Sequence, residues 1–164
     1  MKYMFSRPTD PEKVFSSNIL SPTEANTLAM THSSSEACYG PTNPTPDSQA
    51  KAGVRRFGSV IGLNPEKERY YRELHANVWP GVLERIKKSN MRNFSIYTTA
   101  IEGKKYLFSY FEYAGANYEA DMKAIAEDPE TLRWWKETDP CQIPLPSRDE
   151  GAHWSSMEMV FLGE

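Results

Sequence analysis

The chain has little of several features that would place it in a familiar class. It holds only two cysteines, Cys38 and Cys141, which lie far apart and outside any Cys-x-x-Cys pair. Neither a disulfide framework nor a thiolate metal site is therefore indicated. No apolar run approaches the length of about 20 residues that spans a bilayer, and the N-terminus lacks the apolar core of a secretory signal. We expect a cytoplasmic protein that does not associate with membranes.

The chain also lacks a net positive charge and any common cofactor motif. The formal net charge of -3 leaves no basic surface for a phosphate backbone, so nucleic acid is not an expected partner. The sequence contains no glycine-rich phosphate loop, no HExxH, no GxSxG and no dinucleotide fingerprint. We expect chemistry that needs no cofactor and no preset metal. Metal binding by His75 with a nearby carboxylate stays open as an alternative.

Residues 1–50 differ in composition from the rest of the chain. They are rich in Ser, Thr, Pro and Asn, and their apolar residues are too scattered to form a stripe. Such a segment cannot bury enough surface to offset the entropy lost on ordering. We predict a disordered or poorly ordered N-terminal tail over 1–50 and a single domain over 51–164. A targeting role for the tail is a weaker alternative, because Asp10 and Glu12 interrupt its basic residues.

The remaining chain predicts alternating strands and helices. Proline at the first turn, turn residues between β-rich runs and apolar periodicity give the boundaries. The expected elements are a strand over 54–63, helices over 65–78 and 80–90, two hairpin strands over 94–103 and 104–115, a helical stretch over 117–138 interrupted at Asp128-Pro129, and a last strand over 155–164.

This order predicts an α+β domain of the ferredoxin-like βαββαβ type. Its four-stranded antiparallel sheet carries helices on one face only, so the other face must be covered by something else. Many proteins of this type pair two sheets into a dimeric α+β barrel. We expect the same here, and hence a homodimer.

Aromatic and imidazole side chains are evenly spaced in the segment YRELHANVWP. Tyr71, His75 and Trp79 follow one another at intervals of four residues, so a helix would place them on one face. The unperturbed pKa of histidine, about 6.5, makes His75 the best candidate for a proton carrier near neutral pH. The Tyr71 hydroxyl lies one turn away and can act on the same ligand. A purely structural role for each side chain is the alternative.

A second aromatic pair, Trp134 and Trp135, lies far along the chain in RWWKET. Neighbouring residues on a helix diverge by about 100°, so we expect one indole in the core and the other in a cavity. Apolar sugar faces stack on indole rings, and placed polar groups bind the hydroxyls. Together with His75 the pair indicates a pocket for a small monosaccharide. Packing of both indoles in the core is the alternative.

Three motifs in order, YxxxHxxxWP, RNFSIY and RWW before a Thr-Asp turn, resemble those of the L-rhamnose mutarotase family. The resemblance covers approximately Val54 to the C-terminus and none of the tail. It implies a dimeric ferredoxin-like barrel that interconverts the α and β anomers of a free L-sugar without a cofactor. Such an enzyme is an isomerase.

The resemblance also implies roles for individual residues. His75 corresponds to the catalytic acid and Tyr71 to a substrate-contacting partner. Our own hypothesis for the mechanism is that His75 protonates the ring oxygen while Tyr71 or a bound water handles the anomeric proton. Trp134 and Trp135 correspond to sugar-contacting residues. Phe94 departs from the family pattern, which has a substrate-binding tyrosine there, so L-fucose or another related sugar stays open beside L-rhamnose.

Two other function classes remain as alternatives. A cofactor-free oxygenase of the same dimeric barrel type would consume oxygen with an aromatic substrate. A non-catalytic sugar-binding module would use the same tryptophans and would bind its ligand without His75.

Overall fold

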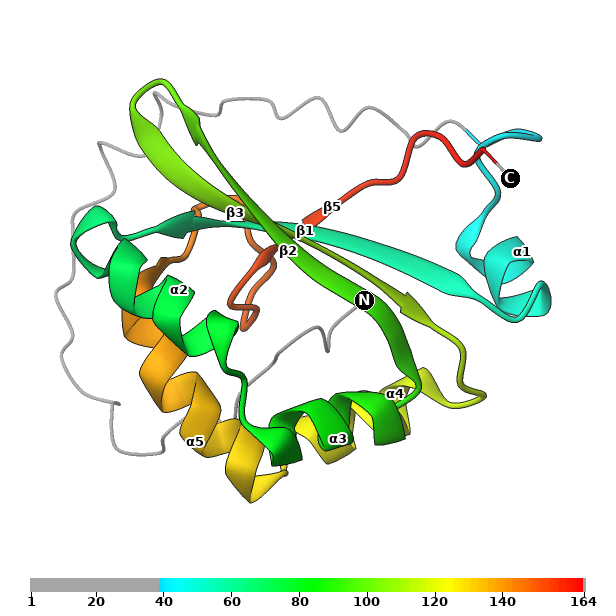
Figure 1. Cartoon of the computed structure of the whole chain (residues 1–164). Helices are drawn as coiled ribbons and strands as arrows, with labels where there is room; N and C mark the ends of the chain where they lie inside the picture. The colour runs from blue at the N-terminus through cyan, green and yellow to red at the C-terminus, as the bar shows by residue number, and fades with distance from the viewer. Residues whose placement is uncertain (1–38, 164) are drawn as a thin grey trace, which may run out of the picture.

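The computed structural model describes residues 39–163, and the elements follow the predicted order with additions at both ends (Figure 1). In chain order they are α1 (Pro46–Lys51), β1 (Arg55–Leu63), η1 (Pro65–Lys67), α2 (Glu68–Ala76), α3 (Pro80–Lys88), β2 (Met91–Ile101), β3 (Lys104–Tyr113), α4 (Tyr118–Ala126), α5 (Pro129–Thr138), η2 (Asp139–Cys141), β4 (Gln142–Ile143) and β5 (Ser155–Met157).

The strands form one antiparallel sheet in the order β2-β3-β1, and the other edge of β1 pairs with both β4 and β5. Because β1 and β2 are both antiparallel to β3, they run parallel to each other, as a βαβ unit requires. Helices α2 to α5 lie on one face of the sheet (Figure 1). The predicted ferredoxin-like α+β fold is confirmed, and its dimeric form stays a prediction.

Local sequence signals account for most of the boundaries. Glu102 and Gly103, which join β2 to β3, both have positive φ angles of 49° and 75°. A two-residue turn of this type matches the twist of a hairpin. Helices α3 and α5 both begin at a proline, whose missing N–H costs nothing at a helix start. The predicted hairpin and both proline-led helices are confirmed.

The end of the chain differs from the prediction. The expected strand over 155–164 is confirmed only at β5, Ser155–Met157, while the unpredicted β4 occupies the same edge of β1. The residues after β5 leave the sheet, and the Leu162 N–H donates to the Thr42 carbonyl. Alternating apolar residues here therefore do not extend the ladder, because the segment leaves the edge of β1 and contacts residues before α1.

Most of the predicted tail, residues 1–38, lies outside the described residues. Residues 39–50 are described, and they contain α1, capped by the Thr45 hydroxyl. Gln49 of α1 is buried, and its side-chain oxygen accepts a hydrogen bond of 3.0 Å from the Arg56 N–H. The last part of the segment is thus attached to β1. Within residues 39–163, no helix has the length and apolar character needed to cross a bilayer.

A β-bulge in β2 sets which side chains face the helices. The register with β3 shifts between Arg92 and Ser95, and Asn93 adopts a positive φ of 51°. The extra residue changes the alternation, so that Met91 and Ile96 both pair with inward-facing positions of β3. Phe94, next to the bulge, contacts Phe111 of β3 edge to face at 5.8 Å. The bulge therefore aims Phe94 at the helices.

The core between sheet and helices consists of two clusters. One gathers Ile61, Leu63, Tyr71, Leu107, Cys141 and Trp154 beneath α2 and η2, and the other gathers Met91, Phe111, Tyr113, Met122 and Ile125 near α3 and α4. Members of both clusters line a single cavity. The cavity therefore lies between the two core clusters.

Candidate active site

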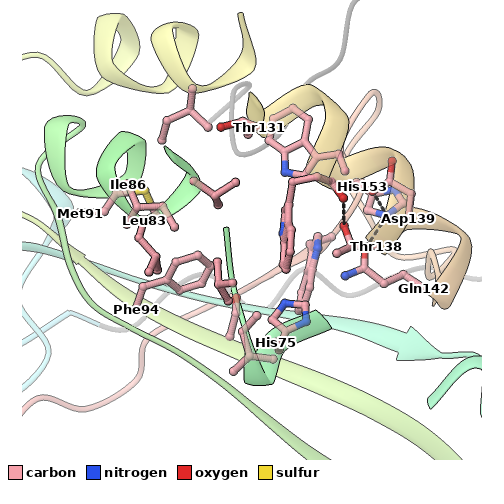
Figure 2. Close-up of a pocket in the computed structure, with 18 of the residues that line it drawn as sticks. His75, Leu83, Ile86, Met91, Phe94, Thr131, Thr138, Asp139, Gln142 and His153 are labelled. Atoms are coloured by element: carbon pink, nitrogen blue, oxygen red, sulfur yellow. Dashed lines mark hydrogen bonds and ion pairs between the residues drawn. The ribbon is translucent and has the colours of Figure 1, made fainter. Parts of the chain in front are cut away.

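The cavity has a volume of about 490 Å³ and lies between the inner face of the sheet and helices α2, α3 and α5. Its walls differ in character, as Figure 2 shows: apolar side chains lie on one side, and polar side chains from the end of α5 onward lie on the other. The predicted site residues all line it, namely Tyr71, His75, Phe94, Trp134 and Trp135. Segments far apart in sequence thus converge on one pocket, while the roles of these residues stay predictions.

His75 lies in the last turn of α2 between two aromatic rings. Its imidazole stacks on Tyr71 with centroids 4.1 Å apart and meets Trp134 edge to face at 5.3 Å. His75 Nδ1 lies 2.9 Å from the Tyr71 carbonyl oxygen. A carbonyl only accepts, so Nδ1 carries a hydrogen and Nε2 is the nitrogen left for a ligand.

Burial determines the protonation state of His75. It lowers the pKa of His75 below the usual 6.5, and the hydrogen bond to the Tyr71 carbonyl opposes this shift only in part. The neutral imidazole therefore predominates at neutral pH, with a lone pair on Nε2. In this form His75 is a base, and it becomes an acid once it has taken a proton from a ligand.

Tyr71 is more deeply buried than His75, with 4% of its surface exposed. Burial raises the pKa of the Tyr71 phenol well above its usual value, and a contact from the Gln142 side chain opposes the shift only in part. No described residue forms a hydrogen bond of ordinary geometry with the hydroxyl. The phenol therefore keeps its proton and can act as a hydrogen-bond donor.

Both tryptophans of α5 reach the cavity, which corrects the expectation that only one does. Trp134 is 6% exposed and lies against His75 and Trp79, whereas Trp135 packs beside the core cluster that contains Met91 and Ile125. The cavity is wide enough to be lined by both indoles although they diverge on the helix. Two adjacent residues of a helix, such as Trp134 and Trp135, can therefore line the same cavity when the helix passes over it.

The apolar wall explains the surroundings of Phe94. Leu83 and Ile86 of α3, with Met91 at the start of β2, lie on the same side of the cavity as Phe94 (Figure 2). The ring of Phe94 offers no hydrogen bond, and none of these neighbours does. This side suits a C–H or methyl surface of a ligand.

The polar wall was missed by the sequence analysis. It consists of Thr138, Asp139, Gln142 and His153. His153 and Gln142 lie outside the motifs described above, and Asp139 belongs to the Thr-Asp turn after the tryptophans. Folding brings them together, because His153 Nε2 lies 2.8 Å from Gln142 Oε1 and 3.5 Å from Asp139 Oδ1.

Metal binding was left open for His75. Among residues 39–163, no three His, Cys, Asp or Glu side chains are gathered closely enough to hold a metal ion. The groups around His75 are aromatic rings and a backbone carbonyl. The arrangement can bind a small polar ring with apolar faces and exchange a proton with it at His75 Nε2.

Comparison with known proteins shows the family to which the chain belongs. The family model for L-rhamnose mutarotase matches residues 56–162. L-rhamnose mutarotases of Lactiplantibacillus plantarum and Listeria monocytogenes are 32% and 30% identical to the chain, over 52% and 57% of it and 77% and 86% of their own lengths. A crystal structure of L-rhamnose mutarotase from Formosa agariphila shares the fold, with a TM-score of 0.51 and 20% identity over 67% of this chain and 99% of that one. The chain belongs to the L-rhamnose mutarotase family.

Proposed function

We propose that the protein interconverts the α and β anomers of free L-rhamnose by opening and closing the sugar ring. The observation that carries the proposal is the position of His75, whose imidazole lies between the Tyr71 and Trp134 rings in the cavity wall and uses Nδ1, not Nε2, for its contact with the Tyr71 carbonyl. Family membership supports the same reaction. The protein is thus an isomerase acting on a carbohydrate.

Ring opening needs a proton to leave the anomeric hydroxyl and another to reach the ring oxygen. Neutral His75 takes the anomeric proton on Nε2 while the bond between C1 and the ring oxygen breaks. The imidazolium then delivers that proton to the released ring oxygen, which was bonded to the same carbon and is still close to the imidazole. The free aldehyde rotates about the C1–C2 bond, and the reverse steps close the ring on its other face. One imidazole thus serves as base and then as acid.

Tyr71 supports these steps without ionising. Its raised pKa means that a phenolate would be costly, so the hydroxyl donates a hydrogen bond to a sugar oxygen instead of transferring its proton. The expected transfer of the anomeric proton to Tyr71 is therefore disfavoured relative to transfer to His75. Trp134 and Trp135 hold the faces of the sugar in reach of the imidazole.

We also propose that two copies of the chain form a homodimer through the face of the sheet opposite the helices. The sheet face opposite the helices carries exposed Tyr97 and Ile101, and a second sheet would cover them. The expected cytoplasmic location stays a prediction.

Saturation-transfer NMR on free L-rhamnose tests the function directly, because it reports exchange between anomers at equilibrium. We expect wild-type protein to raise the exchange rate above the spontaneous rate. His75→Ala should lose most or all of this catalysed exchange. Glu73→Ala, an exposed substitution on the same helix, is the matched control and should retain wild-type exchange. Wild-type exchange in a folded His75→Ala variant would remove His75 from the mechanism.

The same samples separate the other function classes. A sugar-binding module would show ligand binding but no catalysed exchange in wild type, and its affinity would survive His75→Ala. An oxygenase would consume oxygen with an aromatic substrate. We expect no oxygen consumption above the rate without enzyme.

A further inference from the structure

The polar wall of the cavity is a connected chain of side chains. Asp139 lies on η2, Gln142 begins β4, and His153 lies in the loop before β5. His153 Nε2 contacts Gln142 Oε1 at 2.8 Å and lies 3.5 Å from Asp139 Oδ1, as Figure 2 shows beside the cavity. Neither Gln142 nor His153 has a role in the proton transfers proposed above.

The partners of His153 fix where its proton lies. A carboxylate oxygen only accepts hydrogen bonds, so Asp139 favours a hydrogen on Nε2 of His153. That hydrogen is donated to Gln142 Oε1, the nearer of the two oxygens. With its oxygen occupied on this side, the Gln142 amide must present its NH₂ group on the other side.

The other side of Gln142 is the side of Tyr71. The two residues line the same cavity, and the Gln142 side chain lowers the pKa of the Tyr71 phenol, as a donor to the phenol oxygen does. The Tyr71 hydroxyl forms no hydrogen bond of ordinary geometry with any described residue, so its oxygen is open to such a donor. An amide NH₂ has two hydrogens. One can face Tyr71, which leaves the second for a ligand.

We propose that Gln142 is a substrate-contacting residue that donates a hydrogen bond to a sugar hydroxyl, and that His153 is the positioning residue that fixes its amide. The proposal rests on the mutarotase function proposed above. It adds a specificity determinant on the wall opposite Phe94. The sugar is then held between an apolar wall and an oriented donor.

Two substitutions of Gln142 remove the donor in different ways. Gln142→Leu removes the whole amide, and Gln142→Glu keeps an acceptor for His153 but supplies no NH₂. We expect both to raise KM for L-rhamnose about tenfold, with a smaller effect on kcat. The 2-, 3- and 4-deoxy analogues of L-rhamnose identify the contact, because the analogue that lacks the contacted hydroxyl should lose nothing further. An equal further loss with all three analogues, or an unchanged KM in both folded variants, would overturn the assignment.

Two substitutions of His153 test positioning. His153→Leu should raise KM as Gln142→Leu does, and the double variant should be no worse than either single one. His153→Asn should recover part of the loss, because its amide can still donate to Gln142 Oε1. Full additivity in the double variant would contradict a positioning role.

A readout that does not depend on activity keeps the two proposals separable. Nitrogen-15 NMR of the wild-type imidazoles should show the His153 hydrogen on Nε2. A neutral His153 with its hydrogen on Nδ1 would overturn the amide orientation even in an active enzyme. Absence of exchange with every sugar would instead overturn the mutarotase function, and the NMR result would still decide the orientation of Gln142.

Discussion

Phe94 lines the apolar side of the cavity, where the proposed function places the apolar surface of the sugar. Its ring packs against Phe111 beside Met91, on the side of the cavity that also carries Leu83 and Ile86. A tyrosine at this position, as in the family pattern, would add a hydroxyl that needs a partner when buried. A bound sugar is the partner available in the cavity, so this position affects specificity more than folding.

Phe94→Tyr should therefore change the preference between L-rhamnose and L-fucose by about 1–3 kcal/mol in kcat/KM. Anomer exchange measured on both sugars with wild type and variant gives the change directly. Phe108→Tyr, a substitution on the opposite face of the sheet by its register, is the matched control. If Phe94→Tyr shifted both sugars equally, the ring would not contact the part of the sugar in which they differ.

The protonation of His75 predicts the pH dependence of the reaction. The base form is neutral, and burial lowers the pKa of His75 below 6.5. Activity should therefore be complete above that pKa and should fall as pH drops through it. The acid limb of kcat/KM, after subtraction of the spontaneous rate, should have its midpoint below 6.5.

A second imidazole, His153, also lines the cavity. A variant must therefore show which of the two histidines causes the fall in kcat/KM at low pH. His153→Asn keeps a donor for Gln142 and should leave the midpoint unchanged. A midpoint above the ordinary histidine value would contradict the buried, neutral state of His75.

At the level of residues, the sequence predicts the contacts between side chains that are close in the chain. Tyr71 and His75 are one helical turn apart, and a helix alone brings them into contact. Gln142 and His153 meet only because β4 and the loop before β5 fold back along β1. No local periodicity encodes that contact, so the polar wall was not predicted.

At the level of elements, α5 carries much of the site and begins with a strong cap. Asp128 Oδ2 accepts a hydrogen bond of 2.8 Å from the Thr131 N–H. Burial raises the pKa of Asp128, but hydrogen bonds from Thr131 and the charge of Arg85 lower it by more, so the net shift is downward. The cap therefore stabilises the fold above the unfolded pKa of aspartate and is lost as pH falls through the lowered pKa.

Asp128→Ala should lower the free energy of unfolding by about 1 kcal/mol at neutral pH, because it leaves an N–H of the first turn without its partner. Urea denaturation measures the loss. Asp128→Asn, which can still accept the hydrogen bond, should lie close to wild type. An Asp128→Ala variant as stable as wild type would show that water replaces the cap at no cost.

The elements themselves were largely predictable because proline, turn residues and periodicity act locally. The two-residue turn at Glu102-Gly103 and the helix starts at Pro80 and Pro129 are examples. The short β5 was not predictable, because the residues after it leave the edge of β1 and Leu162 contacts Thr42. A contact between segments so far apart in the chain is a tertiary property.

At the level of the whole molecule, the two faces of the sheet differ. The inner face is filled by the core clusters and the cavity, whereas the outer face has no helix of α2 to α5 over it (Figure 1). By register, Tyr97 and Ile101 of β2 and Phe108 of β3 point outward, and 65% of Tyr97 is exposed. Aromatic side chains on an uncovered sheet are typical of a face that pairs with another surface.

Tyr97→Glu tests this face, because a carboxylate buried under a second sheet would lack a partner and would carry a large desolvation cost. We expect wild type to sediment as a dimer at micromolar concentration and Tyr97→Glu to sediment as a monomer. Lys88→Glu reverses a charge on the exposed side of α3 and should stay dimeric. The cavity lies on the other face, so a folded Tyr97→Glu monomer should keep its exchange activity per chain. A monomeric wild type would leave the outer face without the second sheet that the fold predicts.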